Sequence, residues 1–96
     1  MPRPKKIRCI SCRPDATYFK PRGIPLIHLD EIAISLDELE AVKLADYEGL
    51  YHEDAALCMK ISRQTFGRIL HNARRKVAEF LIMGKALHID VRQKEA

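Results

Sequence analysis

Long hydrogen-bond donors recur at helical spacing between residues 61 and 76. At about 100° per residue, one side of a helix would carry Gln64, Arg68, His71 and Arg75. Apolar residues fall on the opposite side, at positions 66, 69, 70, 73, 77 and 80. We call the four polar positions the donor stripe. It contains no carboxylate, whereas an ordinary surface helix mixes charges of both signs, so it indicates an anionic partner.

The side chains of the donor stripe match the hydrogen-bonding edges of DNA bases. A glutamine amide can bridge N6 and N7 of adenine, and a guanidinium can bridge O6 and N7 of guanine, so Gln64 and Arg68 are the predicted base readers. Residues at the helix start are better placed for phosphates, which favour backbone amides and the positive end of the helix dipole. The whole predicted contact set is Ser62, Arg63, Gln64, Thr65, Arg68, His71, Arg74 and Arg75. The alternative is a solvated surface, and His71 fits a neutral surface histidine equally well.

Three helices are predicted between residues 35 and 84, and they would position this stripe. Ser35 and Glu38 have the spacing of a capping box, and the helix they begin should stop at Gly49. A second helix is expected at about 52–59 and a third, the predicted recognition helix, at 62–83. A turn of three or four residues joins the last two, which is the helix-turn-helix arrangement. The expected fold is therefore mainly α.

The two flanks are predicted to be extended parts of the same structural domain. Residues 1–34 read as a basic arm followed by a segment rich in proline and glycine, with a short strand at 7–11. Residues 26–34 fit either extended chain or a short helical turn. Residues 85–96 should form a short strand at 86–89 and a charged tail. The arm residues Arg3, Lys5 and Lys6 would reach into a minor groove or only solubilise the chain, and the sequence leaves both open.

Cys9 and Cys12 form a C-x-x-C pair. A structural zinc site needs four ligands, usually from two close pairs, and neither Cys58 nor the four histidines supply a second pair. We therefore predict no metal and no cofactor, and keep Cys9 and Cys12 only as weak candidates. The carboxylates lack a histidine or nucleophile at useful spacing, so we predict neither an enzyme nor a small-molecule substrate.

Composition sets broad limits on the class of protein. The 96 residues are 47% hydrophobic, which excludes general disorder, and the net charge of +4 is only mildly basic. No apolar run approaches the roughly 20 residues that cross a bilayer, and no secretory signal follows the basic start. Three cysteines, an odd number, indicate a reducing compartment. The predicted location is the cytoplasm, with no membrane partner.

Several segments resemble known proteins. LDELEAVKL (36–44), YEGL (47–50), EDAA (53–56), ISRQTF (61–66) and ARRK (73–76) resemble the helix-turn-helix of sigma-factor region four. MPRPKK (1–6), FKPRGIPL (19–26) and GKALHI (84–89) resemble a small prokaryotic family described only as predicted DNA-binding proteins. The resemblance implies a sigma region-four-like fold and DNA binding, but no target. Two positions depart from it: Tyr51 replaces a polar N-cap, and Lys60 replaces a turn glycine at a cost of about 1 kcal/mol.

The predicted function is sequence-specific binding of double-stranded DNA, as a transcriptional regulator. One alternative is a protein-interaction module of the transcription machinery, and another is a thiol- or metal-responsive regulator acting through Cys9 and Cys12.

We also predict a homodimer, because the distal part of the third helix is apolar at Val77 and at 80–83. The competing cover is intramolecular, by the proline-rich loop and a pairing of 7–10 with 86–89.

Overall fold

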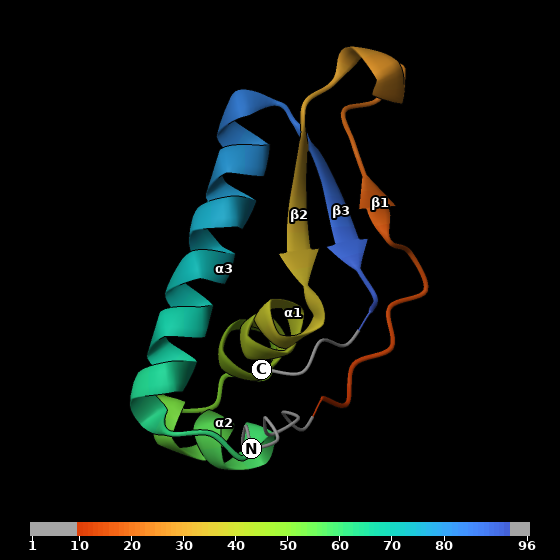
Figure 1. Ribbon diagram of the computed structural model, residues 1–96. Helices are drawn as coiled ribbons and strands as arrows, with labels where there is room; N and C mark the ends of the chain where they lie inside the picture. Colours follow the sequence, from red (N-terminus) through yellow and green to blue (C-terminus); the bar gives the residue numbers. More distant parts are fainter. Residues whose placement is uncertain (1–9, 93–96) are drawn as a thin grey trace, which may run out of the picture.

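Three α-helices lie beside a three-stranded sheet in the computed structural model, which describes residues 10–92 (Figure 1). The helices are α1 (Leu36–Val42), α2 (His52–Met59) and α3 (Arg63–Met83). The strands are β1 (Tyr18–Phe19), β2 (Glu31–Ser35) and β3 (Ala86–Asp90). A π-helical segment, Lys43–Tyr47, extends α1, and a 3-10 turn, Leu26–His28, precedes β2. The three predicted helices are all present, and helical segments of every kind make up about half of the described residues.

The sheet was predicted only in fragments. Its order is β1-β3-β2, with β3 antiparallel to β1 and parallel to β2. The strand expected at 86–89 is confirmed, and the ambiguous segment 26–34 is a 3-10 turn followed by β2. The strand expected at 7–11 is wrong where the structure describes it, at residues 10 and 11, while residues 7–9 lie outside the described part. The physical reason is that the amides of Ser11 and Cys12 donate to the Glu40 carboxylate instead of to a strand.

Local caps begin and end the helices where the sequence indicates. The Ser35 hydroxyl accepts from the Glu38 amide, and the Glu38 carboxylate accepts from the Ser35 amide at 2.9 Å, which confirms the capping box. Lys60, just after α2, has φ 57° and ψ 44°, so the non-glycine turn does adopt the left-handed conformation. Tyr51 occupies the N-cap of α2 without a side-chain cap bond within the described chain. Tyr51 thus occupies the N-cap position and Lys60 the left-handed turn position, where the sequence departs from the resemblance.

α3 contributes side chains to two separate hydrophobic clusters, one along each half of its length. Its first half contributes to a cluster between the helices, composed of Ala41, Leu44, Ala55, Ala56, Met59, Phe66, Ile69 and Leu70. Its second half contributes to a cluster against the sheet, composed of Ile34, Leu36, Ala73, Leu87 and Ile89. Val77 and Phe80 pack against this second cluster, so the sheet covers them without a second copy. At the end of α3, Leu81, Ile82 and Met83 stay 68%, 79% and 65% exposed.

Candidate nucleic-acid interface

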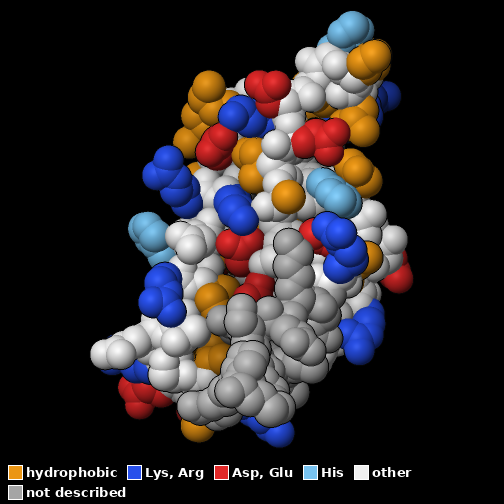
Figure 2. Space-filling model, in the orientation of Figure 1, with side chains coloured by type: hydrophobic (Ala, Val, Ile, Leu, Met, Phe, Trp, Pro, Cys, Tyr) orange, Lys and Arg blue, Asp and Glu red, His pale blue; other side chains and the backbone are white. Residues whose placement is uncertain are grey.

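The donor stripe is exposed along its whole length. Gln64, Arg68, His71 and Arg75 all face solvent, while Phe66, Ile69 and Leu70 on the opposite side are buried. Figure 2 shows Lys and Arg side chains and a histidine along the edge of the molecule formed by α3. Glu79, in the last two turns, is the only carboxylate of α3, and it bonds to Lys85 at 2.6 Å. The first four turns of the helix therefore carry no carboxylate.

The start of α3 is organised by two hydroxyls. The Ser62 Oγ accepts from the Thr65 amide at 3.1 Å and donates to the Thr65 hydroxyl at 2.9 Å. The first turn contains no acidic residue, so no local carboxylate offsets the positive end of the helix dipole. Arg63 is exposed beside it. Of the predicted phosphate contacts, Ser62, Arg63 and Thr65 thus lie together at this end.

Arg74 has a partner that sequence reasoning missed. Its Nε and Nη2 donate to the two carboxylate oxygens of Asp46 at 3.1 and 2.6 Å. The hydrogen bond from Arg74 lowers the pKa of Asp46, so the carboxylate stays charged at neutral pH. This bidentate pair ties α3 to the π-helical segment that follows α1. Arg74 is therefore a positioning residue in the free protein, whereas our sequence analysis treated it only as a contact to DNA.

Glu40 anchors the first described residues to α1. It is only 3% exposed, and its carboxylate accepts from the Ser11 hydroxyl at 2.9 Å and from the Cys12 amide at 2.9 Å. Burial, together with the hydrogen bond to Glu40 and the Glu40 charge, raises the pKa of the Cys12 thiol to about 11. A thiol with this pKa stays protonated at neutral pH, which disfavours a reactive or metal-binding role for Cys12.

Some predicted residues lie outside the part of the chain that the structure describes. These are Arg3, Lys5, Lys6 and Cys9. Between residues 10 and 92, the structure contains no group of three or more His, Cys, Asp and Glu side chains that could hold a metal ion. The same range contains no helix that is both long and apolar enough to cross a membrane.

Comparison with known proteins places the chain in a family. Residues 1–94 match the family model described as "Protein of unknown function DUF134". This chain belongs to the DUF134 family. A UPF0251 protein of Desulfosudis oleivorans is 52% identical over 90 residues, which cover 94% of this chain and 65% of that protein. A UPF0251 protein of Thermoanaerobacter pseudethanolicus is 49% identical over 90 residues, which cover 94% of this chain and 76% of that protein.

The chain thus spans about two thirds of the first DUF134 relative and three quarters of the second. No solved structure matches it. Membership of an uncharacterised prokaryotic family, expected from the sequence, is confirmed, and the names of these relatives state no ligand or activity.

Asn72 belongs to the exposed surface of this DUF134 protein although the sequence analysis omitted it. It lies four residues after Arg68, which turns it by about 40° from Arg68 around the helix axis. Asn72 is exposed, and its amide has the donor and acceptor that adenine recognition uses. The spacing of about 100° per residue that defined the donor stripe was enough to place Asn72 on the same exposed surface.

The Glu40 anchor should make stability depend on pH. Although burial alone raises the pKa of Glu40, hydrogen bonds from Cys12 and Ser11 outweigh it and hold that pKa below the usual range of a glutamate. A carboxylate whose pKa is lower in the folded state stabilises the fold above its unfolded pKa. That stabilisation is lost as the pH falls through the folded pKa. Urea denaturation of Glu40→Gln should therefore show a lower free energy of unfolding at pH 7 and a smaller loss on acidification than the wild type.

Glu31→Gln is the matched control, because Glu31 is an exposed carboxylate at the start of β2. It should retain the wild-type acid sensitivity. Equal acid sensitivity of Glu40→Gln and wild type would show that the anchor contributes nothing to folding.

Proposed function

We propose that this chain binds double-stranded DNA at specific sequences in the cytoplasm, as a non-enzymatic transcriptional regulator. In this proposal α2, the turn and α3 act as a sigma region-four-like helix-turn-helix, and α3 enters the major groove. The observation that carries the proposal is the donor stripe, which is exposed and free of carboxylates on a helix whose other face is buried. A phosphate-lined groove that displays base edges is the surface that such a stripe complements.

The connection between α2 and α3 supports the same proposal. Three residues, Lys60 to Ser62, join the two helices, and the cluster between the helices fixes them by packing Met59 and Ala55 against the buried face of α3. Gly67, near the donor stripe, has no heavy atom within 4 Å of the position its Cβ would take. A glycine inside a helix costs about 1 kcal/mol relative to alanine. Packing in the free protein gives no reason for this glycine, whereas close approach to a groove does.

Binding to duplex DNA at several salt concentrations tests the proposal. Fluorescence anisotropy with random duplex should give an affinity that falls linearly with salt on a log–log plot, with a slope of about −0.9 for each phosphate contact. Selection from a random pool should then yield a preferred sequence that is bound more tightly than random duplex. Weak binding that does not depend on salt would contradict the proposal.

The second candidate function is a protein-interaction module of the transcription machinery. Tyr47 ends the π-helical segment, Tyr51 is the N-cap of α2 and Leu57 lies in α2, and they are 87%, 80% and 75% exposed. Exposed aromatic and apolar side chains are enriched in the central part of protein interfaces. This function predicts no salt-dependent binding of random duplex, so the same titration separates the two.

We also propose a homodimer through the exposed end of α3. The end of α3, which carries Leu81, Ile82 and Met83, lies at the end of the molecule opposite α2 (Figure 1). A two-fold contact there leaves both donor stripes free, and two copies of α3 would then read two half-sites of an inverted repeat.

A further inference from the structure

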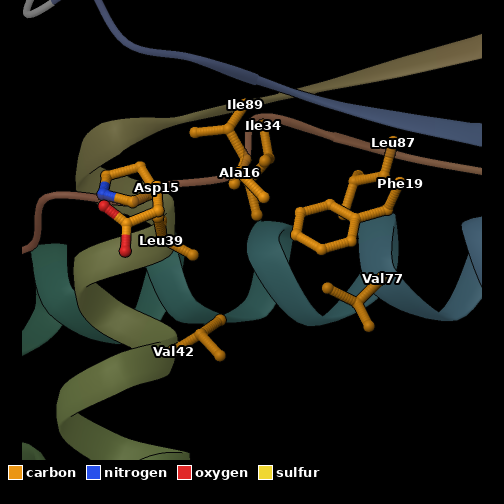
Figure 3. Close-up of a pocket in the computed structure, with 10 residues that line it drawn as sticks. Asp15, Ala16, Phe19, Ile34, Leu39, Val42, Val77, Leu87 and Ile89 are labelled. Atoms are coloured by element: carbon orange, nitrogen blue, oxygen red, sulfur yellow. The ribbon is translucent and has the colours of Figure 1, made fainter.

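The groove between the sheet, α1 and α3 is apolar. Its walls include Phe19, Val77 and Leu87, and the Asp15 carboxylate at its rim points away from it (Figure 3). Nothing within residues 10–92 shows what would cover this groove, so it identifies no ligand. A charged side chain in the turn between α2 and α3 is more informative, because the backbone there is strained.

The strained residue is Lys60. Among residues 10–92 it is the only residue other than glycine with a positive φ, and it has φ 57° and ψ 44°. The other left-handed positions in this range are Gly23, Gly49 and Gly84, which have no Cβ to clash with the backbone. Strained residues cluster at sites that contact a ligand, so Lys60 is a candidate for such a contact.

The fold itself does not require a lysine at this position. The Lys60 side chain is exposed, and within residues 10–92 its ammonium group makes no hydrogen bond or ion pair. The Lys60 amide donates to the Leu57 carbonyl at 3.1 Å. The Ile61 amide donates to the Ala56 carbonyl at the same distance, and the Ile61 side chain packs against the cluster between the helices. A glycine at position 60 would keep all of these contacts.

The charged groups on both sides of the turn indicate the chemistry of the ligand. Between Asp54 and Glu79 the sequence contains no carboxylate, so Lys60 belongs to a basic stretch that continues through Arg63 into α3. When α3 enters a major groove, the turn before it lies over the edge of the groove, where the phosphates of one strand run. A lysine, whose ammonium group is carried on a flexible four-carbon stem, can reach such a phosphate.

We propose that Lys60 binds a DNA phosphate at the edge of the groove that α3 enters. A phosphate contact carries no sequence information, so Lys60 contributes to the affinity for every duplex and not to the preference between duplexes. The strain at Lys60 is then offset in the complex and not in the free protein. This inference rests on the proposed DNA binding, and it adds to the interface a residue outside α3 that our predicted contact set did not include.

Anisotropy titrations of the full-length Lys60→Met variant, on a selected site and on random duplex, test the contact. Methionine keeps the Cβ and an unbranched stem but removes the charge. The affinity for both duplexes should fall by the same factor, and the slope of log affinity against log salt should become shallower by about 0.9, the value for one phosphate contact. The advantage of the wild type over this variant should therefore shrink about threefold between about 50 and 200 mM salt. Lys60→Arg keeps the charge and should keep the wild-type slope.

Lys60→Gly separates the backbone strain from the charge. Glycine adopts the left-handed conformation without a clash, so this variant should melt at a temperature no lower than the wild type. Its salt slope should nevertheless match that of Lys60→Met, because the charge is lost in both. Lys20→Met is the matched control, since Lys20 is an exposed lysine just after β1, outside the turn, and it should keep the wild-type slope.

The same titrations distinguish failure of this inference from failure of the proposed function. A wild-type salt slope in Lys60→Met would overturn the assignment of Lys60, while the salt dependence of the wild type would still support DNA binding. A lower melting temperature of Lys60→Gly would also overturn it, because the lysine would then serve the fold. If binding of the wild type to duplex DNA does not depend on salt, the proposed function is wrong and the assignment of Lys60 is wrong with it.

Discussion

Replacing Arg68 with alanine should lower the affinity for a selected DNA site by about 1–3 kcal/mol while leaving the fold intact. Arg68 is exposed, and within residues 10–92 its guanidinium has no hydrogen bond or ion pair to lose. The energy that disappears on truncation is therefore the energy of contacts made to DNA. If those contacts are the two bonds to O6 and N7 of one guanine, preference at a single base pair should flatten.

Anisotropy titrations of wild type and variant, on the selected site and on random duplex, give the measurement. Arg22→Ala is the matched control, because it removes the same charge from an exposed position in the loop before β2. It should change both affinities only slightly. Equal losses on the selected and random duplexes for Arg68→Ala would make Arg68 a phosphate contact instead of a base reader.

Arg74→Ala should behave differently from Arg68→Ala because of its partner. Truncation leaves Asp46 without the bidentate bonds that join it to α3, so the orientation of the helix changes along with the charge. Specific and random binding should both weaken, because Arg74 lies beside the donor stripe rather than in it. The structure supplies a second cause for that loss, and Asp46→Asn separates the two because it loosens the pair without removing the cation.

The helices could be predicted because their signals are local. Ser35 with Glu38, Ser62 and Gly84 each act within a few residues of the helix end they define. The donor stripe follows from the same local periodicity, since residues three and four apart in a helix share a face. What the sequence does not reveal is which cations on that helix are already paired. Asp46 lies 28 residues before Arg74, and no local pattern connects them.

The sheet could not be predicted for a related reason. β2 and β3 pair in parallel although three helices separate them in the chain, and β1 is only two residues long. Parallel strands receive their register from the packing of the intervening helices, which a single sequence does not display. The sequence analysis did not single out Glu40 inside α1, yet its buried carboxylate accepts from the amides of Ser11 and Cys12 and keeps them out of the sheet.

Replacing Ile82 with glutamate should convert a dimer into a monomer. Ile82 is 79% exposed and, with Leu81 and Met83, forms an apolar end on α3. Burying such a side chain contributes roughly 1.5–3 kcal/mol, whereas a glutamate there would have to be desolvated. Sedimentation equilibrium at micromolar concentration should show a wild-type dimer and an Ile82→Glu monomer. Phe80→Glu would not serve, because Phe80 packs against the sheet cluster and its replacement would disturb the fold.

Loss of the dimer should also lower the affinity for DNA. From Phe66 to Ile82, α3 rises about 24 Å at 1.5 Å per residue. If the two copies of α3 meet near Ile82, their axes must cross at roughly a right angle to place the two Phe66 positions about 34 Å apart, which is the spacing of the half-sites. A monomer loses the second half-site, and its affinity for an inverted repeat should fall about 100-fold or more. Leu57→Glu is the matched control, since Leu57 is 75% exposed on α2, at the opposite end of the molecule. A folded wild type that sediments as a monomer at this concentration would rule out the dimer, and the apolar end of α3 would then need another partner.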